Sequence, residues 1–156
     1  MVVECMKLTS KSRYAVTAMI DIALNQDQGA ITLAIISERQ GISLSYLEQI
    51  FASLKRQKLV TSVRGPGGGY RLNDAPENIS VAQIINAVDD QSETVKCGSK
   101  GGCGKGAKCL SHDLWQALSL NIEQFLKEIS LRDVLHPKNN SIIAEINFDT
   151  KPKGLA

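Results

Sequence analysis

Residues 59–72 combine the sequence features of a β-hairpin. Two short runs rich in β-forming residues, 59–64 (LVTSVR) and 70–72 (YRL), flank the glycine-rich stretch 65–69 (GPGGG). β-Branched and aromatic residues favour strands, whereas glycine and proline favour turns, so the pattern predicts strand, turn and strand. A nucleotide-phosphate loop is a poor alternative, because no Lys-Ser/Thr pair follows and no helix begins there. A plain hairpin turn also fits the glycines, so the elements that precede the hairpin must show whether it is the wing of a larger motif.

Two short helices joined by a tight turn are predicted immediately before the hairpin. Thr32 can cap a helix that runs to Gln40, and Gly41 follows where glycine most easily adopts a left-handed backbone. The next helix runs to about Lys58, and its apolar stripe has i, i+4 and i+7 spacing: Leu47, Phe51 and Leu54. For its start, Ser45 and Glu48 have the spacing of a capping box, with Ser43 as a competing cap. A hairpin after this helix-turn-helix predicts a winged helix.

Three further helices are predicted around this unit. Apolar residues recur at helical spacing over 11–26, and Ser80 with Gln83 offers a capping box for a helix that ends near Asp90. A long helix is predicted from 111 or 112 to about 129, with one apolar stripe: Leu114, Leu118, Ile122, Phe125 and Ile129. A second subunit would cover this stripe in a two-fold dimer, and packing on the 11–26 helix of the same chain is the alternative.

The predicted fold is therefore mainly α, a winged helix-turn-helix with a small β-hairpin wing. We expect the DNA-binding domain over residues 6–76. Residues 77–136 hold a linker helix, a loop at 91–112 and a long dimerisation helix, and residues 137–156 form a flexible tail. The loop has no apolar periodicity, so something other than a hydrophobic core must order it.

Positive charge is concentrated in one part of the chain. The formal net charge of the 156 residues is only +2, but the segment from Glu38 to Arg71 holds six basic and two acidic residues. Its basic residues are Arg39, Lys55, Arg56, Lys58, Arg64 and Arg71. Such a segment can form a local phosphate-binding face, and a glycine-rich tip between Arg64 and Arg71 suits close approach to a sugar-phosphate backbone. A solvated helix face is the alternative.

Composition and motifs narrow the class of protein. Hydrophobic residues make up 43% and charged residues 22% of the chain, as in globular domains. The sequence has neither an apolar run of roughly 18–20 residues nor a signal peptide, so we expect no membrane association and a cytoplasmic location. It shows no paired carboxylates, Ser-His-Asp set or substrate-pocket motif, so we expect no enzyme and no catalytic residues.

Three cysteines and one histidine lie close together in the loop. Cys97, Cys103, Cys109 and His112 supply three thiolates and an imidazole, a complete set for a mononuclear or binuclear metal site. Zinc fingers place ligand pairs two to four residues apart, whereas the five-residue gaps here leave slack for a larger inorganic core. Structural zinc and a metal-free redox thiol pair remain the alternatives. Cys5 lies far from this group and is left out of it.

The motifs together resemble the winged-helix iron-sulfur repressor family, which includes regulators of iron-sulfur cluster assembly. The resemblance runs through KLTSKSRYA (7–15), ISERQGISLSYLEQ (36–49), VRGPGGGY (63–70) and the cysteine loop, which is most of residues 6–135. Departures from the family pattern are Met1–Cys5, Ser12 where glycine is usual, and the tail after about His136.

The resemblance implies a cytoplasmic, homodimeric transcription factor that binds double-stranded promoter DNA, with repressor and activator activity. One 2Fe-2S cluster per subunit is implied on Cys97, Cys103, Cys109 and His112, with the iron-sulfur assembly machinery as its donor. A related repressor that responds to nitric oxide through a 4Fe-4S cluster, and a cluster carrier without a DNA role, are the alternatives.

The DNA contacts are predicted in the second helix of the helix-turn-helix and in the wing. The residues are Ser43, Ser45, Tyr46, Glu48, Gln49, Arg64, Gly67 and Gly68. An acid in the major groove can accept from cytosine N4 but is penalised opposite acceptors, so Glu48 can reject sequences. The resemblance implies that Glu48 excludes one class of operator until cluster binding repositions the helix; a capping-box glutamate on the Ser45 amide is the alternative.

Overall fold

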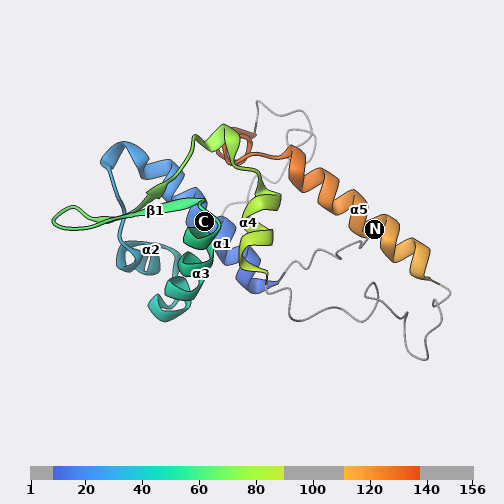
Figure 1. The fold of residues 1–156 in the computed structure, drawn as a ribbon, viewed down its shortest axis with the longest axis horizontal. Coiled ribbons are helices and arrows are strands. Elements are labelled where there is room, and N and C mark those ends of the chain that lie inside the picture. The colour runs from blue at the N-terminus through green and yellow to red at the C-terminus, as the bar shows by residue number, and fades with distance from the viewer. Residues whose placement is uncertain (1–8, 90–110, 138–156) are drawn as a thin grey trace, which may run out of the picture.

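The computed structural model describes residues 9–89 and 111–137 of the chain (Figure 1). In chain order, the elements are α1 (Ser10–Asn25), the 3-10 turn η1 (Gln26–Gln28), α2 (Leu33–Gln40), α3 (Leu44–Arg56), β1 (Val60–Val63), β2 (Gly69–Leu72), the 3-10 turn η2 (Pro76–Asn78), α4 (Val81–Val88), α5 (His112–Glu128) and α6 (Leu131–Leu135). The predicted mainly α winged helix-turn-helix is confirmed. Cys97, Cys103 and Cys109 lie outside the described residues, as does nearly all of the predicted tail.

Side-chain caps fix where the helices begin. The Thr32 hydroxyl accepts from the Ile35 amide at 3.3 Å and opens α2, as predicted. At α4, the Ser80 hydroxyl accepts from the backbone amide of Gln83 at 3.2 Å, and the side-chain Oε1 of Gln83 accepts from the backbone amide of Ser80 at 2.8 Å. This reciprocal pair is the predicted capping box.

The start of α3 corrects one prediction. Its N-cap is Ser43, whose hydroxyl accepts from the Tyr46 amide at 3.4 Å, and Ser45 already lies inside the helix. The predicted capping box of Ser45 and Glu48 is therefore wrong. The physical reason is that the turn after Gly41 is short, so the chain reaches helical geometry at Leu44 and the first of the two serines meets the unpaired amides.

One hydrophobic core joins α1, α2, α3, α4, α6 and the hairpin. Its largest fully buried side chain is Phe51 of α3, whose ring centroid lies 4.9 Å from that of Tyr70 on β2. The predicted stripe of α3 is confirmed, since Leu47, Phe51 and Leu54 have no exposed surface. Burial of each such side chain stabilises the fold by roughly 1.5–3 kcal/mol.

The predicted hairpin is an antiparallel pair of four-residue strands. Val60 pairs with Leu72 and Val63 pairs with Gly69, and the loop between them projects away from the helices (Figure 1). The extended residue Ile31 adds a bridge on the other side of β2: its amide donates to the Tyr70 carbonyl at 2.9 Å, and the Tyr70 amide donates to the Ile31 carbonyl at 2.7 Å. The wing is thus attached to the segment that leads into α2.

The last turns of α5 and the short α6 pack against the rest of the fold. Phe125 and Leu126 contact a second apolar cluster of Val81, Ile85 and Ile129, and Leu131 at the start of α6 is fully buried. Helix α6 contacts α1 and η2, and it was not predicted from the sequence. The first turns of α5 extend away from α1–α4 (Figure 1).

The apolar stripe of α5 is only partly covered. Leu114 is 64% exposed and Leu118 46% exposed, whereas Ile129 is buried. The end of the stripe is covered within the chain mainly by Val81 and Ile85 of α4, with Val16 of α1 at the edge of the same cluster, whereas its beginning is exposed.

Candidate nucleic-acid interface

Helix α3 presents a polar edge to solvent beside a fully buried face. Ser43, Ser45, Glu48 and Gln49 are exposed, while Leu47 between them is buried. The fold therefore brings together most of the α3 residues that the sequence predicted for DNA contact. Their hydroxyl, carboxylate and amide groups can donate to or accept from the edges of bases.

Tyr46 differs from these residues because its ring is half-buried. It packs against the core and meets the ring of Tyr14 on α1 edge-on, with a centroid distance of 5.8 Å and an interplanar angle of 88°. Tyr14 is 42% exposed. The ring pair links the first turn of α3 to α1, so Tyr46 helps to position this edge whatever its hydroxyl contacts.

The turn between α2 and α3 is closed by backbone geometry. Gly41 has φ 65° and ψ 28°, in the left-handed region, and its amide donates to the Ser37 carbonyl at 2.9 Å. The Ser37 hydroxyl donates to the Ile42 carbonyl. Gly41 thus ends α2 as predicted and sends the chain directly into the Ser43 cap.

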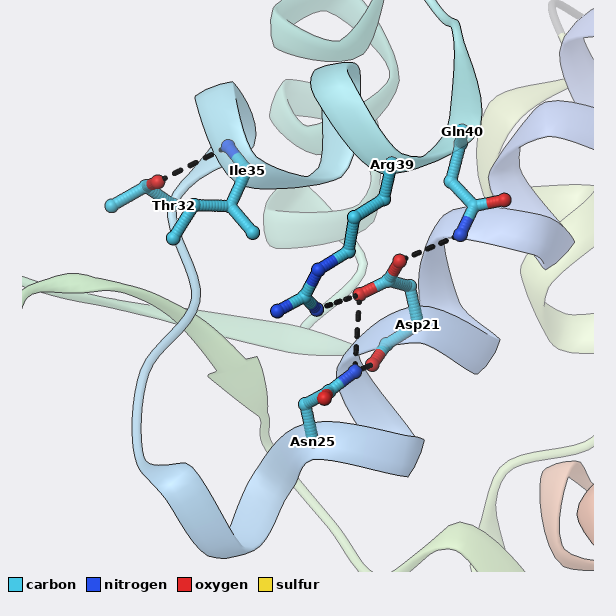
Figure 2. Close-up of polar contacts among 6 residues, drawn as sticks. All are labelled: Asp21, Asn25, Thr32, Ile35, Arg39 and Gln40. Atoms are coloured by element: carbon cyan, nitrogen blue, oxygen red, sulfur yellow. Dashed lines mark hydrogen bonds and ion pairs between the residues drawn. The ribbon is translucent and has the colours of Figure 1, made fainter.

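A buried carboxylate on α1 ties down the end of α2 (Figure 2). The Asp21 side chain is 3% exposed, and its Oδ1 atom lies 2.9 Å from Nη1 of Arg39. Gln40 Nε2 donates to Oδ2 of Asp21 at 2.7 Å. Asn25 Nδ2 donates to the Asp21 backbone carbonyl at 2.7 Å and to Oδ1 at 3.3 Å. We refer to these four residues as the Asp21 network.

The wing tip carries one exposed cation among glycines that the turn itself requires. Arg64 is exposed at the end of β1. Gly65 and Gly67 have φ values of 92° and 72°, which favour glycine, with open space around them. A Cβ on Gly68 would overlap the Val63 carbonyl oxygen and lie 2.7 Å from the Gly65 carbonyl oxygen. The glycines therefore have a structural role in the hairpin, beside any contact with a ligand.

Asn73 fastens the base of the wing to the end of α3. Its Nδ2 donates to the Lys58 carbonyl at 2.9 Å, and its Oδ1 accepts from the Thr61 hydroxyl at 2.7 Å. Lys55 Nζ also donates to the Ser62 hydroxyl at 2.9 Å. These bonds hold the two parts of the predicted DNA-binding surface in a fixed relation. No motif in the sequence had pointed to Asn73.

The basic segment is less uniform than its sequence suggests. All six basic residues are exposed, but Arg39 is paired with the buried Asp21 carboxylate; the other five are Lys55, Arg56, Lys58, Arg64 and Arg71. They come from the end of α3 and from the wing. The local excess of positive charge thus lies around the wing and the end of α3 rather than along α2.

One of the four predicted metal ligands is described. His112 is the first residue of α5 and is half-buried; the N-cap position before it is Ser111, whose hydroxyl accepts from Trp115 Nε1 at 3.0 Å. Within residues 9–89 and 111–137, no three His, Cys, Asp or Glu side chains are grouped to hold a metal ion. The three cysteines precede this helix in the chain, so His112 directly follows the segment that carries them.

These elements define a winged helix-turn-helix protein with a polar edge on α3 and a cation on the wing. No helix in the described parts of the chain has the length and apolarity needed to cross a membrane. Residues 8–137 match the Rrf2 family, described as iron-dependent transcriptional regulators. The chain belongs to the Rrf2 family of transcriptional regulators.

Individual relatives agree with this assignment. The chain is 57% identical over 130 residues to the HTH-type transcriptional regulator IscR of Aliivibrio salmonicida, covering 83% of this chain and 77% of that protein. It is 51% identical over 142 residues to IscR of Escherichia coli, covering 91% and 86%. The solved structure of T. potens IscR superposes with a TM-score of 0.69 at 34% identity, covering 85% and 88%. The chain is thus an Rrf2-family regulator similar to IscR.

Proposed function

We propose that this chain binds promoter DNA as a homodimer and controls genes of iron-sulfur cluster assembly. The occupancy of a 2Fe-2S cluster then changes which operators it binds. The observation that carries the DNA-binding part is the exposed polar edge of α3 next to a basic wing. The similarity to proteins named IscR supports the iron-sulfur part.

Base reading is assigned to the edge of α3. Ser43, Ser45 and Gln49 are exposed and offer donors and acceptors to the major groove, and Tyr46 stands at the rim of this edge. On the wing, Arg64 contacts a phosphate or the minor groove, and the small Gly67 and Gly68 let the backbone come close to the duplex. The phosphate contacts set the register, and the contacts to base edges set the sequence preference.

Glu48 is proposed as the residue that rejects one class of operator. Its side chain is exposed on the same edge, and it cannot serve the N-cap, which is Ser43. In the major groove, a carboxylate can accept a hydrogen bond from the N4 amine of cytosine. Opposite base acceptors or phosphates it is repelled, so duplexes that place those groups there bind less well. Removing the carboxylate therefore broadens the set of duplexes that bind.

The ligand set proposed for the cluster is Cys97, Cys103, Cys109 and His112. Its chemistry fits, because thiolates and imidazole are the donors that hold binuclear iron-sulfur cores, and His112 is half-buried at the start of α5 rather than locked inside the core. When bound, the cluster supplies a redox-active group of low stability toward oxidants. The iron-sulfur assembly machinery is the proposed donor.

The dimer is proposed to form through α5. Leu114, Trp115 and Leu118 lie within about 100° of one another around this helix and are between 46% and 64% exposed. A contiguous exposed apolar surface is typical of an interface, and a two-fold dimer would match a palindromic operator. Leu118→Lys should convert the dimer to monomer in analytical ultracentrifugation, and an unchanged dimer would refute this assignment.

Anaerobic purification with absorption and Mössbauer spectra tests the cofactor. A 2Fe-2S spectrum supports the proposal, a 4Fe-4S spectrum supports the nitric-oxide-responsive alternative, and zinc without iron refutes both. Ala variants of Cys97, Cys103 and Cys109 should lose the iron, and Cys5→Ala is the matched control that should keep it. His112→Cys should retain iron but be harder to reduce, because a thiolate adds one negative charge to the site.

Gel-shift and fluorescence-anisotropy assays test the DNA-binding part. Arg64→Ala should weaken binding to a duplex selected from a random library and lower the log-log salt slope by roughly one for each phosphate that Arg64 neutralises. Glu48→Ala in the apo protein should gain duplexes that the wild-type apo protein rejects. A cluster carrier without a DNA role would select no duplex.

A further inference from the structure

The Asp21 network is built around a carboxylate that the proposed function does not use. Asp21 is 3% exposed, and both of its side-chain oxygens are engaged, Oδ1 by Arg39 and Oδ2 by Gln40. Figure 2 shows the two side chains reaching from the end of α2 down to α1, with Asn25 one turn further along α1. No buried side-chain nitrogen or oxygen in the described residues lacks a partner.

Stability alone does not explain this arrangement. Only the Asp21 side of the ion pair is buried. Burying this carboxylate costs desolvation free energy that its bonds to the exposed Arg39 and Gln40 roughly offset, and an apolar side chain of similar volume often stabilises a fold as well or better. The neighbouring residues Ala18, Ile22 and Ala23 on α1 are all buried and apolar, so an apolar residue would suit position 21. A charged network held there points to a requirement for direction and register, which hydrogen bonds supply and apolar contacts do not.

Helix α2 needs such a constraint because its apolar attachment is small. It has eight residues, of which Ile36 is buried and Leu33, in the first turn, is partly buried against the core. The Asp21 network holds the last two residues, Arg39 and Gln40, and so fixes the end of α2 that the apolar contacts of Leu33 and Ile36 do not reach. Attachment at both ends keeps this short helix from pivoting about its apolar contacts.

The network lies close to the DNA-reading edge along the chain. Gly41 and Ile42 follow Gln40 directly, and Ser43 then caps α3. A shift of the last turn of α2 is therefore passed through two residues to the cap of α3. The network also pairs the Arg39 guanidinium, which is 40% exposed, with a carboxylate, so its charge attracts phosphates less than that of the five other basic residues.

We infer that Asp21 is a positioning residue for DNA selectivity. Its carboxylate locks the last turn of α2 to α1, which fixes how the Ser43 end of α3 is presented, and it neutralises Arg39 so that this cation does not add sequence-independent attraction. This inference rests on the proposed DNA-binding function. It assigns to Asp21 an effect on the ratio of specific to non-specific affinity, not on the DNA contacts themselves.

The test compares Asp21→Asn with Asp27→Asn, an acid exposed in η1 that lies outside the network and gives the same change of net charge. Affinity is measured by anisotropy for a duplex that the wild-type protein selects from a random library and for a scrambled duplex of the same composition. Asp21→Asn should lower the ratio of the two affinities at least tenfold, with affinity for the scrambled duplex unchanged or raised. Asp27→Asn should leave the ratio within twofold of wild type.

A double variant separates positioning from stability. Asp21→Asn alone leaves Arg39 without its counter-charge, whereas Asp21→Asn with Arg39→Gln removes both charges and should recover much of the urea midpoint. If the inference is correct, the double variant recovers stability and its affinity for the scrambled duplex returns to that of wild type, because the Arg39 cation is gone. Its affinity for the selected duplex stays low, because α2 is no longer locked to α1, so the ratio of the two affinities remains below that of wild type. If Asp21→Asn fails to fold, Gln40→Ala keeps the ion pair and should lower the selectivity ratio to a smaller extent.

Three results would overturn the inference. The first is an unchanged ratio of affinities in folded Asp21→Asn. The second is a double variant that regains the full wild-type ratio together with stability. The third, where Asp21→Asn does not fold, is a Gln40→Ala variant whose ratio equals that of wild type. A wild-type protein that selects no duplex would refute the proposed function and the inference together. If the wild-type protein and the variants have the same ratio of selected to scrambled affinity, only the inference is refuted.

Discussion

Substitution of Gly69 tests how the wing is attached to the body of the fold. Gly69 is the first residue of β2, with φ 145°, and its α-carbon lies against the chain at Ile31. A Cβ at this position would overlap the Ile31 carbonyl and lie 2.8 Å from the Thr32 amide nitrogen. Because these are backbone atoms, the strand itself has to move away in Gly69→Ala.

The expected cost follows from the hydrogen bonds that such a movement breaks. The two bonds between Ile31 and Tyr70, at 2.9 and 2.7 Å, are each worth about 1 kcal/mol. A side chain at positive φ adds roughly 1–2 kcal/mol of backbone strain. We expect Gly69→Ala to lower the free energy of unfolding by about 3–4 kcal/mol, a large share of the roughly 5–15 kcal/mol of a typical domain.

Gly67→Ala is the matched control for this experiment. Gly67 also has positive φ, 72°, but a Cβ added there would meet nothing within 4 Å. It should therefore show the strain alone, about 1 kcal/mol. Urea unfolding followed by circular dichroism measures both values. If the two variants lower the free energy of unfolding equally, within about 0.5 kcal/mol, the close approach of Gly69 to Ile31 does not support the wing, and this account of its attachment is refuted.

Three further predictions concern helix ends and acid. Ser43→Ala should cost about 1 kcal/mol of unfolding free energy in urea titrations and Ser45→Ala less than about 0.5, and equal losses would contradict the assigned cap. Lys58 has φ 59°, a left-handed backbone that is strained for a residue with a Cβ, so Lys58→Gly should raise the free energy of unfolding by about 0.5–1 kcal/mol in the same assay. A lower free energy of unfolding would show that the contacts of the Lys58 side chain stabilise the fold by more than the backbone strain costs. A hydrogen bond from the Asn78 side-chain amide lowers the pKa of Asp74 in the folded protein, so the ionised carboxylate stabilises the fold. This stabilisation is present above the pKa of the unfolded carboxyl and is lost as pH falls through the folded-state pKa. The thermal midpoints of wild type and Asp74→Asn should therefore converge in acid, and a gap that stays constant with pH would contradict this.

Local signals account for most of what the sequence predicted correctly. The stripe of Leu47, Phe51 and Leu54, the Thr32 cap and the left-handed Gly41 each depend on a few neighbouring residues, and all three are confirmed. The hairpin is confirmed as well, since its composition and turn residues lie within 14 consecutive positions. Periodicity and capping work here because the structure they specify is local.

The errors and omissions arise where a local pattern leaves two choices open, where the partner is distant in the sequence, or where the element is very short. Ser43 and Ser45 are both competent caps, and the length of the preceding turn decides between them. Asp21 meets Arg39 from 18 positions away, and its only signal in the sequence is an acid inside the apolar stripe of the first helix. Helix α6 has five residues, too few for a periodic pattern; its local signal is the capping box of Ser130 and Asp133, and Leu131 in its first turn is fully buried.

The way α5 is attached gives it the mechanics of a lever. Its 17 residues span about 25 Å, and its apolar contacts with the described body lie in the last turns, around Phe125, Leu126 and Ile129. His112 stands at the opposite end, so a tilt of only about 5° at the pivot moves it by roughly 2 Å over that length. Conversely, a force applied at His112 is transmitted along the whole helix to the contacts between α5 and α4. A small change in side-chain packing around Ile129 would therefore be accompanied by a large displacement of His112.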